Sequence, residues 1–222
     1  DGNVQTIAVA PDGAILLGTS GNHVDLWSID PTTGVSTMIR SRIDCVLSCV
    51  NADLEGVGIA ADGSAIVALR GYFAGNPGAL LSVDRTTGAA TIVAEGGLLD
   101  SPGQVVVDRD GSWLVADYDA KAILRVDPAS GAQSVAWQGG EHDNFHELAL
   151  AGDGHIVTVG LQAVAGGGLE GAVVDLDPVR KVRRVLMTPA NAASLLIVPG
   201  VPARPACSNG IDDDGDRKRD YW

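Results

Sequence analysis

The stretch Thr6–Thr19, TIAVAPDGAILLGT, joins two short apolar runs through an Asp-Gly pair. Asp-Gly between apolar runs predicts a β-hairpin whose two turn residues both have positive φ. The phrase returns as GVGIAADGSAIVAL, QVVVDRDGSWLVAD and ELALAGDGHIVTVG. The turn aspartates, Asp12, Asp62, Asp110 and Asp153, lie 50, 48 and 43 residues apart. One hairpin therefore recurs at an almost fixed interval.

A second phrase follows each hairpin: DLWSIDPTTGVSTMI, LLSVDRTTGAATIV, ILRVDPASGAQSVAW and VVDLDPVRKVRRVLM. Each consists of a strand, a turn that begins at an aspartate, and another strand. These turns begin at Asp30, Asp84, Asp127 and Asp177. Each repeat thus supplies four antiparallel strands, and no useful stretch of helical periodicity interrupts them.

Four-stranded units that repeat at this interval predict an all-β fold, a β-propeller with four recognisable blades. Residues 193–200, ASLLIVPG, then predict a leftover fifth inner strand. Because the chain also starts on an inner strand, nothing completes that blade, and we expect an excerpt of a larger propeller. We assign the propeller to residues 1–200, and a proline-rich linker with an acidic tail to residues 201–222.

The blade phrase resembles that of NHL-repeat and gluconolactonase-type propellers, which are six-bladed-like and share the pattern v..dG.l.v.d......v..vdp.tG. The resemblance covers about residues 5–188. It implies the fold and leaves the activity open, because such propellers include hydrolases, lyases and pure binding modules.

The composition excludes two classes of function. The formal net charge is −13, and the basic residues cluster at Arg180–Arg184, so we expect no nucleic-acid binding. The longest apolar runs are far shorter than the roughly 20 residues of a membrane-spanning helix, so we expect no membrane span. We expect a monomer.

The cysteines indicate where the protein works. Cys45 and Cys49 are four residues apart and could form a disulfide, which leaves Cys207 without a partner in this sequence. The chain begins at Asp1 rather than Met, which fits removal of a leader or an excerpt. We expect a secreted, periplasmic or cell-surface protein.

The order of strands assigns the connections to two faces of the propeller. One face carries the short, uniform Asp-Gly and Asp-Pro turns, and the other carries long loops that differ between blades. Variable loops on a rigid scaffold carry function, so we predict the ligand on the long-loop face. The candidate ligand-binding residues are Asp117, Asp119, His142, Asp143 and Asn144. A hydrophilic inter-blade loop and a strand end followed by a turn would explain the same residues.

Aligning the repeats on Asp-Gly places Glu55 and Glu147 near the mouth of the central channel, together with Gln104 and either Gln5 or Thr6. Glu55, His146 and Glu147 are the candidates for a catalytic base or for metal ligands. Solvated carboxylates in the channel remain the alternative.

The tail CSNGIDDDGDRKRDYW resembles the C-x-N-G-x-D-x-D-G-D calcium loop found on many secreted bacterial proteins. The resemblance implies calcium ligands at Asp212, Asp214, Asp216 and Asp220. Arg217 departs from the pattern, since it stands where the pattern has glycine, and the second cysteine of the pattern is absent. A disordered acidic tail is the alternative.

Two functions agree with these observations. The first is an extracellular binding or interaction module that takes a protein, a small molecule or a carbohydrate on its long-loop face. The alternative is a metal-dependent, lactonase-like hydrolase or lyase with its site at the channel mouth.

Overall fold

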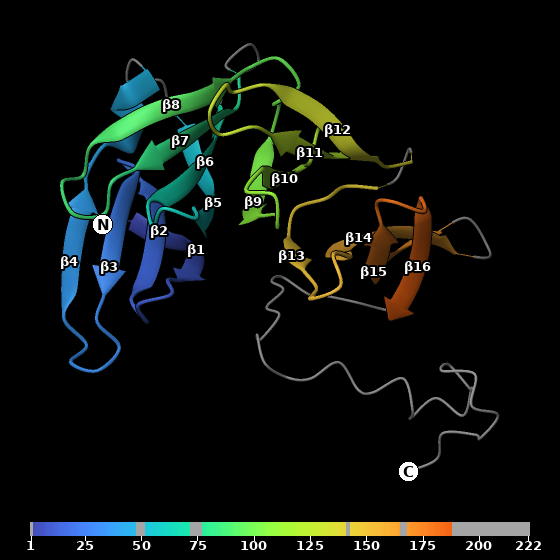
Figure 1. Ribbon diagram of the computed structural model, residues 1–222, viewed down its shortest axis with the longest axis horizontal. Coiled ribbons are helices and arrows are strands. Elements are labelled where there is room, and N and C mark those ends of the chain that lie inside the picture. Colours follow the sequence, from blue (N-terminus) through green and yellow to red (C-terminus); the bar gives the residue numbers. More distant parts are fainter. Residues whose placement is uncertain (1, 48–51, 72–76, 141–142, 165–167, 188–222) are drawn as a thin grey trace.

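The computed structural model describes residues 2–47, 52–71, 77–140, 143–164 and 168–187. They form four four-stranded antiparallel sheets, called blades 1 to 4 below, and in each the strands pair in sequence order. Figure 1 shows the blades following one another around an arc, from the blue N-terminal sheet to the orange C-terminal one. The all-β, four-sheet arrangement predicted from the repeats is confirmed.

Each blade consists of four consecutive strands. Blade 1 comprises β1 (Gly2–Val9), β2 (Ile15–Gly21), β3 (Asp25–Ile29) and β4 (Ser36–Arg40), and a short 3-10 helix, η1 (Ile43–Leu47), follows it. Blade 2 comprises β5 (Ala52–Ile59), β6 (Ala65–Gly71), β7 (Ala79–Val83) and β8 (Ala90–Glu95). Blade 3 comprises β9 (Pro102–Val107), β10 (Trp113–Asp117), β11 (Ala122–Val126) and β12 (Gln133–Gln138). Blade 4 comprises β13 (Leu148–Leu150), β14 (Ile156–Val164), β15 (Gly168–Asp177) and β16 (Val182–Met187).

The Asp-Gly hairpins form as predicted, but the conformation expected for their turns is wrong. Gly13 has a φ of +86°, whereas Asp12 does not have positive φ. The Gly13 N–H donates to the Ala10 carbonyl, and the Ala10 N–H donates to that of Ala14. The Asp12 side chain accepts the Ala14 N–H at 3.1 Å, so the aspartate fixes the turn through its carboxylate instead of through positive φ.

The second turn of each blade is closed by its aspartate. In blade 1, the Asp30 carboxylate accepts the N–H groups of Thr32 and Thr33, and its main-chain carbonyl accepts that of Gly34. Asp84, Asp127 and Asp177 accept the corresponding N–H groups in the other blades. The aspartates of the repeat pattern are therefore structural.

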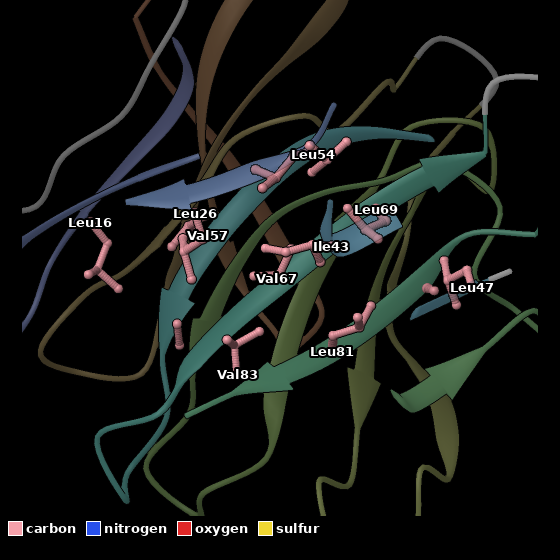
Figure 2. Close-up of a cluster of buried hydrophobic side chains, with 13 residues drawn as sticks. Leu16, Leu26, Ile43, Leu47, Leu54, Val57, Val67, Leu69, Leu81 and Val83 are labelled. Atoms are coloured by element: carbon pink, nitrogen blue, oxygen red, sulfur yellow. The ribbon is translucent and has the colours of Figure 1, made fainter. Parts of the chain in front are cut away.

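The hydrophobic core is divided into layers that lie between consecutive blades. Leu16 and Leu26 of blade 1 pack with Leu54, Val57 and other apolar residues of blade 2, as Figure 2 shows. Two further layers join blade 2 to blade 3 and blade 3 to blade 4. A middle blade is therefore apolar on both faces, which explains the near-continuous apolar runs in its strands.

Three sequence predictions lie outside the described residues. They are the fifth inner strand at 193–200, the partner cysteine Cys49, and the acidic tail. Cys45 lies in η1, and its pairing with Cys49 stays a prediction. Within the part of the chain that the structure describes, no helix is long and apolar enough to cross a membrane.

Candidate functional site

A bulge in the inner strand of blades 1 and 2 inserts one extra side chain on the long-loop side. In blade 1, Val4 pairs with Thr19 and Thr6 with Gly18, so Gln5 has no partner on β2. The same irregularity lies at Glu55 in blade 2. Bulges redirect side chains out of the regular alternation of a strand. Gln5 and Glu55 thus occupy equivalent positions near the inner end of their blades.

Two glycines let the inner strands of blades 2, 3 and 4 approach backbone to backbone. A Cβ atom on Gly56 would overlap the carbonyl oxygen of Gly103, and one on Gly103 would lie 2.6 Å from that of His146. The Gln104 N–H donates to the same His146 carbonyl at 3.0 Å. Blade 4 is therefore joined to blade 3 at the residue next to Glu147.

Gln104 links four blades at this point. Its side-chain amide nitrogen donates to the Val57 carbonyl of blade 2 at 3.1 Å, and its amide oxygen accepts the Thr6 hydroxyl of blade 1 at 3.4 Å. With the main-chain bond to His146, Gln104 holds blades 1, 2 and 4 around blade 3. Its side chain is a positioning element for the residues around it.

Glu55 lies against a cation that is shared with a second carboxylate. The Arg70 guanidinium lies 2.9 Å from the Glu55 carboxylate and 3.4 Å from that of Asp53. The Glu55 side chain is largely buried, whereas that of Arg70 is about one third exposed. Because part of the Arg70 side chain remains exposed, Arg70 can contact a ligand while it holds Glu55.

His146 and Tyr118 extend the cluster towards blades 3 and 4. His146 Nε2 lies 3.8 Å from the second oxygen of Glu55. The Tyr118 ring meets the His146 ring edge to face, with 6.0 Å between the centroids. The Tyr118 N–H donates to the Ser101 carbonyl, which fixes the start of its turn. His146 thus contacts both the Glu55 carboxylate and the Tyr118 ring.

Burial, reinforced by the negative charge of Glu55, raises the pKa of Glu147 to about 7. The main chain at Glu147 is held by the Thr158 hydroxyl, which donates to its carbonyl at 2.5 Å. A carboxyl group that titrates near neutrality can hold or release a proton under working conditions. The structure therefore brings Glu55, His146 and Glu147 together as the alignment predicted, while their role stays a prediction.

The cluster does not fit a divalent metal ion. The Arg70 guanidinium already forms an ion pair with the Glu55 carboxylate, and its positive charge opposes the binding of a metal cation there. Among the described residues, no group of three histidine, cysteine, aspartate or glutamate side chains could hold a metal. The four tail aspartates proposed as calcium ligands, Asp212, Asp214, Asp216 and Asp220, lie outside the described residues.

A polar pocket of about 440 Å³ opens on the long-loop face between blades 1 and 2, next to the channel-mouth cluster. Asp53 belongs to both, since it lines the pocket and pairs with Arg70. The other polar side chains that line the pocket are Asn3, Gln5, Ser20, Asn22, His23 and Asp44. Amides, a hydroxyl, an imidazole and two carboxylates face this space, and among the described residues no lysine or arginine lines it.

Asp117, a predicted ligand-binding residue, instead lies in the framework of the fold. Its side chain is 0% exposed and accepts the N–H groups of Asp100, Ser101 and Ala120 at 2.9–3.1 Å. Burial raises the pKa of Asp117, and these three hydrogen bonds oppose the rise. A buried carboxylate with three backbone donors orders two loops and leaves no surface for a ligand.

The remaining loop candidates are separated by the structure. The Asp119 carboxylate accepts the Ser101 hydroxyl and is exposed. Asp143 accepts the Gly140 N–H at 2.9 Å and lies 3.4 Å from Arg183, so it orders its own loop. Asn144 is partly exposed, and His142 lies outside the described residues. Phe145, between Asn144 and His146, is fully buried and anchors the loop in the core.

Sequence reasoning missed Asp53, Asn3 and Asn22 as pocket residues, and it gave Arg70 no role of its own. Asp53 lies two residues before Glu55 on the same inner strand, so period-two alternation already places it beside the predicted site. The signal for Asn3 and Asn22 is weaker, because Asn3 lies on β1 and Asn22 follows β2 in the same blade, and the pocket forms only where they meet η1 and β5. No periodicity within one strand predicts that.

Comparison with known proteins adds evidence on the fold. No family model matches the chain, and no curated protein matches it. A chain of a nidogen/laminin complex is similar, with 14% identity over 84% of this chain and 65% of that one, and a TM-score of 0.64. Regucalcin from Agrobacterium tumefaciens, described as a calcium-binding protein, gives 20% identity over 77% and 55%, with a TM-score of 0.55. The fold is that of a β-propeller.

Virginiamycin B lyase from Staphylococcus aureus is a third similar structure, with 10% identity over 84% of this chain and 69% of that one, and a TM-score of 0.54. The propeller thus resembles binding proteins and enzymes alike, and identities this low show the fold alone. The chain spans 60%, 65% and 46% of the length of three of the similar structures.

Proposed function

We propose that the protein is a binding module whose long-loop face takes a small, neutral, hydroxyl-rich ligand of the carbohydrate class. The pocket between blades 1 and 2 carries this proposal, because its size fits a small ligand and most of its lining side chains are polar. The fold alone does not distinguish a binding function from a catalytic one, since similar propellers include binding proteins and enzymes.

The chemistry of the lining supports a neutral ligand. The amides of Asn3, Gln5 and Asn22 each donate and accept hydrogen bonds, as sugar hydroxyls do. Asp44 and Asp53 add acceptors and negative charge. Because no lysine or arginine among the described residues lines the pocket, the two carboxylates would repel an anionic ligand.

The test is titration with neutral monosaccharides and disaccharides, each paired with the corresponding uronic acid, followed by saturation-transfer NMR and calorimetry. We expect neutral sugars to bind and the acids to bind at least about tenfold more weakly, the equivalent of about 1.4 kcal/mol. Asn22→Leu should weaken the binding by a similar factor. Asn144→Leu, on the blade 4 loop, is the matched control, and full binding by Asn22→Leu would overturn the assignment to this pocket.

A lactonase-like hydrolase or lyase at the channel mouth is the second candidate, supported by the raised pKa of Glu147 beside Glu55. Glu147 would act as the proton acceptor or donor, and Arg70 would orient a polar substrate. Assays with lactones and esters, with and without added Ca²⁺ or Mn²⁺, test it. Turnover that the Glu147→Gln substitution abolishes would support an enzymatic function. A lack of turnover both with and without the metal ions would exclude these substrates.

We also propose that the protein works outside the cytoplasm, in agreement with a disulfide between Cys45 and Cys49. Mass spectrometry of a non-reduced proteolytic digest tests the pairing. A peptide that contains both cysteines and weighs two hydrogens less than its reduced form would support it. Alkylation of both thiols without prior reduction would contradict it.

A further inference from the structure

The pocket between blades 1 and 2 carries negative charge that its own lining does not balance. The ionisable side chains among its described lining residues are His23, Asp44 and Asp53, and His23 forms no ion pair with either carboxylate there. The lining amides are neutral, and lysine and arginine are missing from the described lining. Residues 48–51, which join η1 to β5 and have the sequence SCVN, contain neither. The two carboxylates therefore depend on groups outside the lining for a counter-charge.

Asp44 has a carboxylate oxygen without a donor. Its Oδ1 is buried and has no hydrogen-bond partner among the described residues, although Asp44 lines the pocket. The backbone beside it is fixed, because the Ile43 N–H donates to the Val24 carbonyl at 2.8 Å and the Ile43 side chain is fully buried. Buried carboxylate oxygens are normally hydrogen-bonded, and an oxygen without a donor destabilises the protein. Asp44 is thus an acceptor held in the pocket wall with its charge uncompensated.

Asp53 has only a share of one cation. Arg70 reaches Oδ2 of Asp53 at 3.4 Å, but it lies closer to the Glu55 carboxylate, at 2.9 Å. One guanidinium cannot neutralise two carboxylates, so these three side chains together keep a negative charge. With Asp44, the described residues of the pocket and its border therefore set three carboxylates against a single arginine.

The chemistry of the two lining carboxylates favours an organic cation as the missing charge. Among the described residues, no group of three histidine, cysteine, aspartate or glutamate side chains could hold a metal ion. An ammonium group needs no such set of ligands, since it carries the charge and donates three hydrogen bonds itself. Carboxylates only accept hydrogen bonds, so they pair with such a donor. A sugar in which an ammonium group replaces one hydroxyl meets these requirements without being larger than a neutral sugar.

We propose that the pocket prefers an amino sugar to the corresponding neutral sugar, with the protonated amine beside Asp44 and in the negative field of Asp53. Neutral sugars remain ligands, because the amides of the lining serve the other hydroxyl groups. This inference rests on the proposed sugar-binding function and narrows its ligand class. The affinity of ligands of similar size then increases from the acid to the neutral sugar and from the neutral sugar to the amine.

Matched pairs of sugars test the preference on the full chain. Glucose, galactose and mannose are each compared with their 2-amino-2-deoxy analogues by calorimetry at about pH 6.5, below the usual pKa range of an amine. Both members of a pair meet the same protonation state of His23, so their affinity ratio isolates the effect of the amine. We expect the amino sugar to bind about tenfold more tightly than its neutral partner. Salt at about 0.5 M should reduce this ratio, because ions screen the attraction.

Two variants and a matched control locate the amine. Asp44→Asn keeps the size of the side chain and removes its charge, so the affinity ratio should fall from about tenfold to about twofold or less. Asp53→Asn should lower the ratio less, because Arg70 already offsets part of the Asp53 charge. Asp100→Asn should leave the ratio unchanged, since Asp100 is exposed between β8 and β9 and does not line the pocket.

The outcomes separate this inference from the function on which it rests. Neutral sugars that bind as tightly as their amino analogues would overturn the preference and leave the sugar-binding function standing. A ratio that both Asp44→Asn and Asp53→Asn leave unchanged would overturn the placement of the amine in this pocket. Failure of the wild type to bind any of these sugars would overturn the sugar-binding function and this inference with it.

Discussion

Glu55 of blade 2 and Glu147 of blade 4 interact electrostatically across the mouth of the channel, although their blades are not neighbours in the arc. The charge of Glu55 adds to the effect of burial and raises the pKa of Glu147 to about 7. Glu55 itself is held by Arg70 at 2.9 Å. Near neutral pH Glu147 is therefore partly protonated, and the Glu55 carboxylate beside it forms an ion pair with Arg70.

The first prediction concerns pH. Between the usual glutamate pKa of 4.5 and about 7, folded Glu147 holds a proton that the unfolded chain releases. The free energy of unfolding should therefore decrease as pH rises through this window. Glu147→Gln should make the decrease shallower and should stabilise the protein at about pH 8 more than at about pH 4. Urea unfolding of both proteins over a series of pH values measures this dependence. Identical slopes of unfolding free energy against pH in the wild type and in Glu147→Gln would contradict the raised pKa of Glu147.

The second prediction concerns Asp117, whose buried carboxylate accepts three N–H groups. Asp117→Ala would leave these buried donors without acceptors and should cost roughly 3 kcal/mol of unfolding free energy. Asp117→Asn, which keeps the shape but loses one acceptor oxygen, should cost less. Asp119→Ala, two residues away and exposed, is the control. Equal stability of the Asp117 and Asp119 variants would refute the structural role.

The third prediction concerns the backbone contact between blades 3 and 4. A methyl group on Gly103 would lie 2.6 Å from the His146 carbonyl, so Gly103→Ala should force the inner strands apart and cost about 1–3 kcal/mol. Because His146 and Glu147 would move with the strand, the pKa of Glu147 should also change. Gly152→Ala is the control, since nothing lies within 4 Å of its added methyl. The unfolding free energies of Gly103→Ala and Gly152→Ala, measured under the same conditions, test this prediction.

The fourth prediction concerns the acidic tail, which lies outside the described residues. If Asp212, Asp214, Asp216 and Asp220 bind calcium, calorimetry should detect one site that disappears when residues 201–222 are deleted. Asp214→Asn should weaken it, because it removes a charged ligand. Calcium that remains bound after the deletion would place the ion on the propeller instead, and an absence of binding to the full chain would end the calcium hypothesis.

The repeat made the fold predictable, because Asp12 and Asp30 and their equivalents each mark a turn and leave strands as the only elements between them. Alignment on those turns also placed Glu55 and Glu147 near the same level, on the inner strands of blades 2 and 4. It could not predict that Arg70 would hold Glu55, since a strand pattern does not determine the reach of a long side chain. Asp117 looked functional because it is polar at a strand end, and only burial and three backbone donors distinguish it from a ligand residue.

The recurrent bulge at Gln5 and Glu55 separates the side chains at the rim of the channel from the packed layers. Each of these two blades presents one extra side chain at a point where its strand makes no regular pair, while the packing layers lie elsewhere in the sheets. A substitution at such a position changes the rim of the channel without changing the volume of any layer. The side chains at the rim can therefore change through single substitutions at these positions, one blade at a time, while the scaffold stays the same.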